Sequence, residues 1–120
     1  MIFIVDSERE MAECVGRATK KAGAEFRIFP DAFSAMAAID EEMPELIFLE
    51  VLLTGPDGFS FLNELISYPD TAKIPVVLVS ALDFSSATEL AAYGVVGVLH
   101  KETMRPEDVA GYVKKYAGAR

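Results

Sequence analysis

Four short apolar runs divide the chain and indicate the buried strands of a sheet. They are "IFIV" (2–5), "LIFL" (46–49), "VVLV" (76–79) and "VVGVL" (95–99). Continuous runs of this length, rich in β-branched residues, are typical of parallel strands that are covered on both faces. A fifth segment, "AEFRIF" (24–29), alternates apolar and polar residues, as a half-exposed edge strand does. The pattern therefore predicts a five-stranded sheet.

Helical patterns fill the intervals between these runs. Ser7 and Glu10 have the spacing of a capping box at the start of a first helix, on which Glu13 and Arg17 stand four residues apart. Asp31 is the expected cap of a second helix. Further helices are expected over 58–67, over 85–93 and from Pro106 onward.

The regular alternation of strand and helix predicts the fold class. Parallel strands joined by helices form a three-layer α/β sandwich with right-handed crossovers, here a (βα)5 arrangement. A chain of 120 residues is long enough to bury a core without disulfides or metals. We therefore expect a single domain over residues 1–120.

Composition narrows the classes of partner and the compartment. A net charge of −8 argues against binding to nucleic acid or to an anionic membrane. No apolar run approaches the roughly 20 residues that a membrane span needs, and the start, "MIFIVDSERE", lacks the features of a signal peptide. The single cysteine, Cys14, cannot form an internal disulfide. These features predict a cytoplasmic protein.

Polar side chains follow four of the five strands at the point where each strand ends. They are Asp6 and Ser7, Glu50, Ser80, and His100 with Lys101. In an open parallel sheet, ligands bind beyond the carboxyl ends of the strands. The sequence therefore predicts that carboxylates, hydroxyls and an amine meet at one edge of the sheet and form a site.

Four segments that contain these residues resemble the receiver domains of response regulators, the modules of two-component signalling that include the chemotaxis regulators. The segments are "FIVDSE", "FLEVLLTGPDGF", "PVVLVSAL" and "VLHKE". They occur in the same order and at similar spacings as in that family, across essentially the whole chain. The resemblance implies a flavodoxin-like fold with the sheet order 2-1-3-4-5.

The resemblance also implies a role for each residue at the sheet edge. In the family, an acidic pair after the first strand holds a magnesium ion, and an aspartate after the third strand accepts a phosphoryl group. A serine or threonine after the fourth strand and a lysine after the fifth contact that group. By position, the acidic pair becomes Asp6 and Ser7, the acceptor becomes Glu50, the hydroxyl is Ser80 and the lysine is Lys101.

Several residues depart from the family pattern, and they cluster at this site. Glu50 replaces the acceptor aspartate, and Ser7 replaces the second acid. Thr54 stands where a proline usually follows the acceptor. Glu102 stands where a proline usually forms a cis bond after the lysine, so a trans bond is expected here. Val98 occupies the switch position, where the family usually has an aromatic ring.

These departures predict a degenerate phosphoacceptor pocket with weak or absent Mg²⁺ binding and no cofactor. Magnesium prefers hard oxygen ligands in a tight octahedron, and the site has lost one carboxylate. Glu8 is not expected to replace it, because it would favour the helix N-terminus instead. Glu50 is expected to pair with Lys101 and to accept a hydrogen bond from Ser80, either as a constitutive substitute for the phosphorylated acceptor or as a structural bridge. Deleting one partner of a buried pair costs about 3–5 kcal/mol, so Glu50→Ala is expected to destabilise the domain by at least a few kcal/mol.

The favoured function is a phosphorylation-independent protein–protein interaction module in signal transduction, not an enzyme. The resemblance implies that its partner surface, also usable for a homodimer, is formed by the fourth helix, fifth strand and fifth helix, residues 85–116, including Glu89 and Lys114. A functional phosphoacceptor receiver of a phosphorelay is the alternative. A flavodoxin-type binder of flavin or nucleotide is disfavoured, because "DSERE" after the first strand is acidic and lacks the glycines of a phosphate nest.

Overall fold

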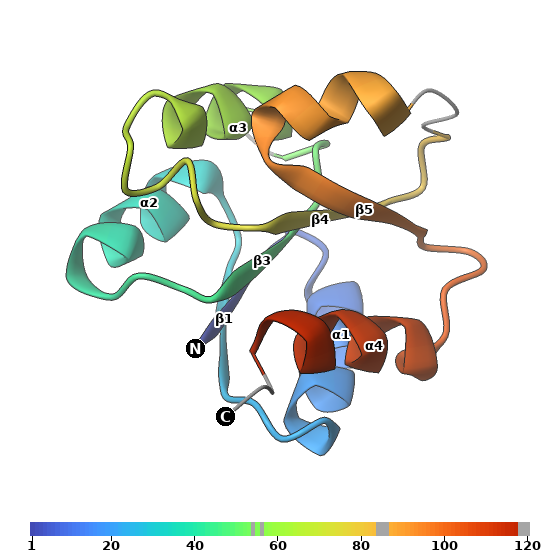
Figure 1. Cartoon of the computed structure of the whole chain (residues 1–120). Helices are drawn as coiled ribbons and strands as arrows, with labels where there is room; N and C mark the ends of the chain where they lie inside the picture. Colours follow the sequence, from blue (N-terminus) through green and yellow to red (C-terminus); the bar gives the residue numbers. More distant parts are fainter. Residues whose placement is uncertain (54, 56, 84–86, 118–120) are drawn as a thin grey trace.

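The computed structural model contains one parallel sheet with the strand order β2-β1-β3-β4-β5 (Figure 1). The structure describes residues 1–53, 55, 57–83 and 87–117. The strands are β1 (Ile2–Val5), β2 (Phe26–Phe29), β3 (Leu46–Leu49), β4 (Val76–Ser80) and β5 (Val95–His100). The predicted strands and their predicted order are confirmed.

Helices cover both faces of the sheet, so the predicted three-layer sandwich is also confirmed (Figure 1). On one face lie α1 (Arg9–Lys21) and α4 (Pro106–Tyr116). On the other lie α2 (Ala32–Glu41), α3 (Gly58–Ile66) and the 3₁₀ helix η1 (Ala87–Tyr93). The helix expected over 85–93 is thus a 3₁₀ helix in its described part, and Ser85 and Thr54 lie outside the described residues.

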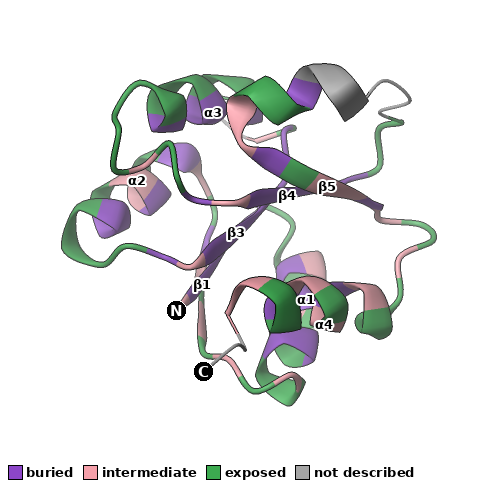
Figure 2. Cartoon of the chain, in the orientation of Figure 1, coloured by how far each residue is buried: buried purple, intermediate pink, exposed green. Residues whose placement is uncertain are grey.

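The core consists of two apolar clusters, one on each side of the sheet. Successive side chains of a strand point to opposite faces, and β1 shows this directly. Phe3 and Val5 pack toward α2 and α3, whereas Ile2 and Ile4 pack toward α1 and α4. The central strands are therefore buried on both faces, as Figure 2 shows. This explains why their sequences are continuous apolar runs.

The start of α1 differs from the prediction. The N-cap residue is Glu8, its side chain makes no capping hydrogen bond, and Ser7 is exposed. The backbone N–H of Glu8 donates to Oδ1 of Asp6 at 2.9 Å. Because Asp6 already orders the chain at this turn, the helix begins at Arg9, and the predicted capping box of Ser7 and Glu10 is wrong.

The predicted pair of Glu13 and Arg17 is also replaced. Nε of Arg9 lies 2.9 Å from Oε1 of Glu13, four residues ahead of it. Arg17 instead donates to Sγ of Cys14 at 3.1 Å. Both contacts lie on the exposed side of α1, where alternative pairs differ little in energy.

The predicted cap of α2 and the predicted start of α4 at Pro106 are confirmed. Oδ1 of Asp31 accepts a hydrogen bond from the Ser34 N–H at 2.8 Å, and this bond holds the pKa of Asp31 below its usual range. Gly23 follows α1 with a positive φ of 98°, a conformation that glycine adopts without strain. Among the described residues, none of the helices has the length and apolar content of a membrane-spanning helix.

Candidate functional site

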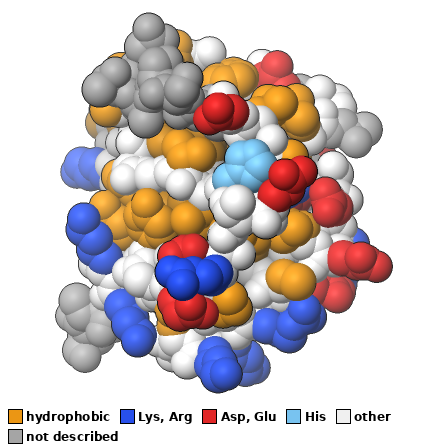
Figure 3. Space-filling model, turned by 90° about the vertical axis from the view of Figure 1, so that its right-hand side faces the viewer, with side chains coloured by type: hydrophobic (Ala, Val, Ile, Leu, Met, Phe, Trp, Pro, Cys, Tyr) orange, Lys and Arg blue, Asp and Glu red, His pale blue; other side chains and the backbone are white. Residues whose placement is uncertain are grey.

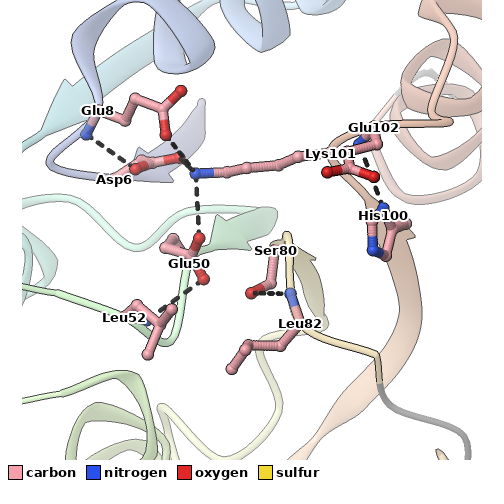
Figure 4. A network of polar contacts seen from close by, with 9 residues as sticks. All are labelled: Asp6, Glu8, Glu50, Leu52, Ser80, Leu82, His100, Lys101 and Glu102. Atoms are coloured by element: carbon pink, nitrogen blue, oxygen red, sulfur yellow. Dashed lines mark hydrogen bonds and ion pairs between the residues drawn. The ribbon is translucent and has the colours of Figure 1, made fainter.

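The ammonium group of Lys101 lies at the centre of the polar edge of the sheet (Figure 4). Its Nζ is 3.0 Å from Oδ2 of Asp6 and 3.0 Å from Oε1 of Glu50. It is also 3.2 Å from Oε2 of Glu8. Asp6 follows β1, Glu50 follows β3 and Lys101 follows β5, so the parallel strands bring together residues far apart in sequence.

Most of this cluster is shielded from water. The side chains of Lys101, Asp6 and Glu50 are 7%, 6% and 5% exposed, whereas that of Glu8 is 60% exposed. Removing an ion from water costs several kcal/mol unless close partners compensate for it. Lys101 is therefore the counterion of two buried carboxylates, and Glu8 closes the cluster on the solvent side.

The pKa shifts reflect the balance between burial and pairing. Burial raises the pKa of Asp6 above its ordinary value, against the lowering effects of the Glu8 N–H and of Lys101. Burial alone would lower the pKa of Lys101, but the hydrogen bonds and charges of Asp6 and Glu50 outweigh it, so the pKa of Lys101 is raised. The folded protein thus holds the Lys101 proton more tightly than free lysine does.

Backbone N–H groups hold the remaining carboxylate oxygens. The Leu52 N–H donates to Oε2 of Glu50 at 3.2 Å, and the Glu8 N–H donates to Oδ1 of Asp6. Both oxygens of each buried carboxylate are therefore engaged. In the part of the chain that the structure describes, no buried side-chain nitrogen or oxygen lacks a hydrogen-bond partner.

Ser80 lies next to this cluster but does not bond to Glu50. Its Oγ accepts a hydrogen bond from the Leu82 N–H at 3.2 Å, and Figure 4 shows the two groups facing each other. The predicted hydrogen bond from Ser80 to Glu50 is therefore wrong. The Glu50 carboxylate is turned toward Lys101 and Leu52, while Ser80, which is fully buried, stabilises the turn after β4.

The two residues that follow Asp6 lie on the solvent side of the cluster. Ser7, at the position of the second acid, is exposed. Glu8 stands at the N-terminus of α1, as expected, but its side chain also reaches Lys101, a contact that was not predicted. A sequence signal for this contact exists, since Glu8 stands two residues after Asp6 and a lone lysine at the site attracts any carboxylate within reach.

The arrangement does not fit the magnesium site that the resemblance implies. Magnesium needs oxygen ligands at about 2.0–2.1 Å. Here Nζ of Lys101 stands between the oxygens of Asp6 and Glu50 that would serve as ligands. The described residues contain no group of three His, Cys, Asp or Glu side chains placed to hold a metal ion.

The segment around Lys101 provides further detail on the predicted site. Val98 is partly buried and packs against the core on the α2–α3 side of the sheet. Nδ1 of His100 accepts a hydrogen bond from the Glu102 N–H at 3.2 Å. The bond between Lys101 and Glu102 is trans, as predicted.

The pairing of Lys101 with three carboxylates permits a test of how much Glu50 contributes. Glu50→Ala is expected to destabilise the protein by about 1.5 kcal/mol, at the low end of what a hydrogen bond to a charged group contributes. This is less than the sequence alone predicts, because Asp6 and Glu8 still pair with Lys101. Urea unfolding would measure the loss, and a change above about 3 kcal/mol would contradict this sharing of partners.

The chain is similar to known signalling proteins. The family described as "Response regulator receiver domain" matches residues 2–113. Response regulator PleD of Caulobacter vibrioides is 42% identical over 53 residues, which are 44% of this chain and 12% of PleD. Regulatory protein VanRc of Enterococcus gallinarum is 34% identical over 80 residues, 67% of this chain and 33% of VanRc. The chain thus spans a third or less of the length of these two relatives. The receiver domain of NtrX from Brucella abortus superimposes with a TM-score of 0.80 at 26% identity, over 100% of both chains.

Proposed function

The chain belongs to the response regulator receiver family of two-component signalling, and we propose that it acts there independently of phosphorylation, as a protein interaction module in the cytoplasm. The observation that carries this proposal is the contact of 3.0 Å between Lys101 Nζ and Glu50 Oε1. In the family the lysine contacts the phosphoryl group on the acceptor aspartate. Here the lysine already has an anionic partner at the acceptor position.

The longer side chain of Glu50 supports its role as a constitutive substitute for the phosphorylated acceptor. Glutamate carries its carboxylate one C–C bond farther from the backbone than aspartate, and this extension brings Oε1 directly to Lys101. The negative charge of Glu50 requires no phosphodonor, and hydrolysis does not remove it. The domain is therefore held in one conformational state. Val98, at the switch position, has no aromatic ring that could change its orientation between two states.

Two features oppose phosphoryl transfer to Glu50. An attacking carboxylate oxygen must be free to approach phosphorus, but one oxygen of Glu50 pairs with Lys101 and the other with the Leu52 N–H. The ammonium also stands where a divalent cation would contact Asp6 and Glu50. Since a misplacement on the order of 1 Å can cost about 100-fold in rate, the added methylene of Glu50 is a further obstacle.

The proposed partner surface consists of η1, β5 and α4, the described counterparts of the fourth helix, fifth strand and fifth helix. Figure 3 looks onto the side of the molecule where β5 ends and the loop to α4 begins, and there Lys and Arg side chains are scattered among acidic and hydrophobic ones. Such a mixed surface suits a protein partner or a second copy of the chain better than nucleic acid or a membrane, which require a concentrated basic patch. Lys114 is an exposed residue of this surface.

Intact-mass spectrometry tests the proposal. The protein is incubated with Mg²⁺ and acetyl phosphate, and a receiver that keeps its acceptor aspartate is treated in parallel as a positive control. The expected result is no change in mass for this chain and a single phosphoryl adduct for the control. An adduct that is lost in Glu50→Gln would overturn the proposal and establish the alternative, a functional phosphoacceptor receiver.

A further inference from the structure

The solvent side of α2, α3 and their adjoining loops, residues 31–43 and 57–70, carries an unusual number of exposed apolar side chains; we call it the α2–α3 face. Phe33 in α2 is 71% exposed, and Phe59 and Ile66 in α3 are 38% and 37% exposed. Met43 and Tyr68, just after the two helices, are 47% and 58% exposed. Figure 2 shows the exposed outer sides of both helices. Apolar side chains exposed on two adjacent helices indicate a site of interaction.

A hollow between the two helices gives this face a specific shape. Its volume is about 160 Å³, and it is lined by Ala32, Phe33, Met36, Ser60, Phe61 and Glu64. Small-molecule sites usually have volumes of about 300–1,000 Å³, so this hollow is too small for a metabolite. An apolar cavity of about 150 Å³ holds a benzene molecule. The hollow therefore fits one apolar side chain of a partner.

The charge of this part of the chain has a single sign. Residues 28–72 contain no lysine, arginine or histidine, although the chain has 11 lysines and arginines. The same segment contains Asp31, Asp40, Glu41, Glu42, Glu45, Glu50, Asp57, Glu64 and Asp70. The net charge of −8 of the whole chain thus originates in this segment.

The carboxylates at the α2–α3 face are largely available to a partner. Glu50 points inward to Lys101, and Glu42 lies 3.7 Å from Arg27 on β2. By contrast, Asp40 and Glu64 are exposed and form no ion pair with any residue that the structure describes. The hollow thus has the carboxylate of Glu64 in its lining and lies within an acidic segment, so a basic partner complements its charge.

We propose that the α2–α3 face binds a basic amphipathic helix of a partner protein. One apolar side chain of that helix enters the hollow, and its lysines or arginines lie over the surrounding carboxylates, as in other helix-in-groove complexes. A second copy of this chain is a poor occupant, because two α2–α3 faces would bring like charges together. The proposal goes beyond the function proposed above and holds whether or not Glu50 accepts a phosphoryl group.

The probe is a synthetic peptide about 14 residues long. It has leucines and lysines at helical spacing and one tryptophan. The chain has no tryptophan, so the peptide fluorescence reports binding directly. The wild-type protein is expected to bind the peptide saturably. Phe33→Ser is expected to raise the Kd at least about tenfold, which corresponds to a loss of 1.4 kcal/mol of binding free energy. Val96→Ser, which removes another exposed apolar side chain, on β5, is the matched control and is expected to leave Kd unchanged.

Charge reversal provides the second arm of the test. Glu64→Lys, at the hollow, is expected to weaken peptide binding severalfold, and Glu10→Lys, on α1 across the sheet, is the control. Circular dichroism confirms that each variant is folded. Equal binding of a peptide with serine in place of leucine would overturn the proposal, because it would show charge attraction alone. Unchanged peptide binding by both Phe33→Ser and Glu64→Lys would also overturn it. So would a protein that binds no peptide but forms a dimer in analytical sedimentation, if Phe33→Ser abolishes that dimer.

Discussion

Lys101→Met is expected to destabilise the protein by about 3–5 kcal/mol near neutral pH, the largest effect of any single substitution at this site. Methionine keeps the unbranched apolar stem but removes the ammonium group that lies 3.0 Å from both Asp6 and Glu50. Two buried carboxylates then face each other without a counterion. Equilibrium unfolding in urea, followed by circular dichroism, measures the loss.

The dependence of this loss on pH identifies its electrostatic origin. Folding raises the pKa of Lys101, so the folded state binds this proton more tightly than the unfolded state. The stabilisation is complete below the ordinary lysine pKa of about 10.4 and is lost as pH rises through the higher folded pKa. Folding also raises the pKa of Asp6, chiefly because the carboxyl group is buried. The folded state therefore binds the Asp6 proton more tightly than the unfolded state does, and protonation of Asp6 at low pH favours folding. The difference between wild type and Lys101→Met should therefore be largest near neutrality and shrink toward both extremes.

Lys114→Met is the matched control for this experiment. Lys114 is exposed near the end of α4, where a surface substitution usually changes stability by less than about 0.5 kcal/mol. A loss of stability in Lys101→Met that equals the loss in Lys114→Met would show that the network contributes nothing. A large loss that does not vary with pH would point to packing instead of charge.

The sequence predicts the strands of this protein well, because each central strand is buried on both faces. "IFIV", "LIFL" and "VVLV" are continuous apolar runs for this reason, and the polar residue after each run marks the edge of the sheet. Asp6, Glu50 and Lys101 could be assigned to one site from that pattern together with the parallel topology.

The details that the sequence does not predict depend on side-chain rotation and on competition between partners. The side chains of Glu8 and Arg9 are long and exposed, and they pair with Lys101 and Glu13 respectively. The Ser80 hydroxyl can donate to a carboxylate or accept from a backbone N–H, and in the structure it accepts from the N–H of Leu82. Alternative side-chain contacts that differ in free energy by less than about 1 kcal/mol cannot be told apart from the sequence pattern.

Gly58→Ala is expected to destabilise the protein by about 3 kcal/mol, at the upper end of the range for overpacking. Gly58 is the first residue of α3, and its N–H donates to the carbonyl of Val51 at 2.8 Å. A Cβ at this position would lie 3.0 Å from the Glu50 carbonyl oxygen and closer still to Cα of Val51. Because the obstacle is backbone, relief requires α3 or the end of β3 to move.

The movement forced by this methyl group also connects the fold to the site. Glu50 and Val51 form the turn that aims the Glu50 carboxylate at Lys101, so displacing them should lengthen that contact as well as weaken the core. Gly111→Ala in α4 is the matched control, because its added Cβ meets nothing within 4 Å. Alanine in a helix interior should stabilise that variant by about 0.5–1 kcal/mol. Opposite signs for the same substitution, measured by thermal and urea unfolding, are the expected result. Similar shifts in both variants would mean that the approach of α3 to Glu50 is not tight, and that the position of the carboxylate depends on Lys101 alone.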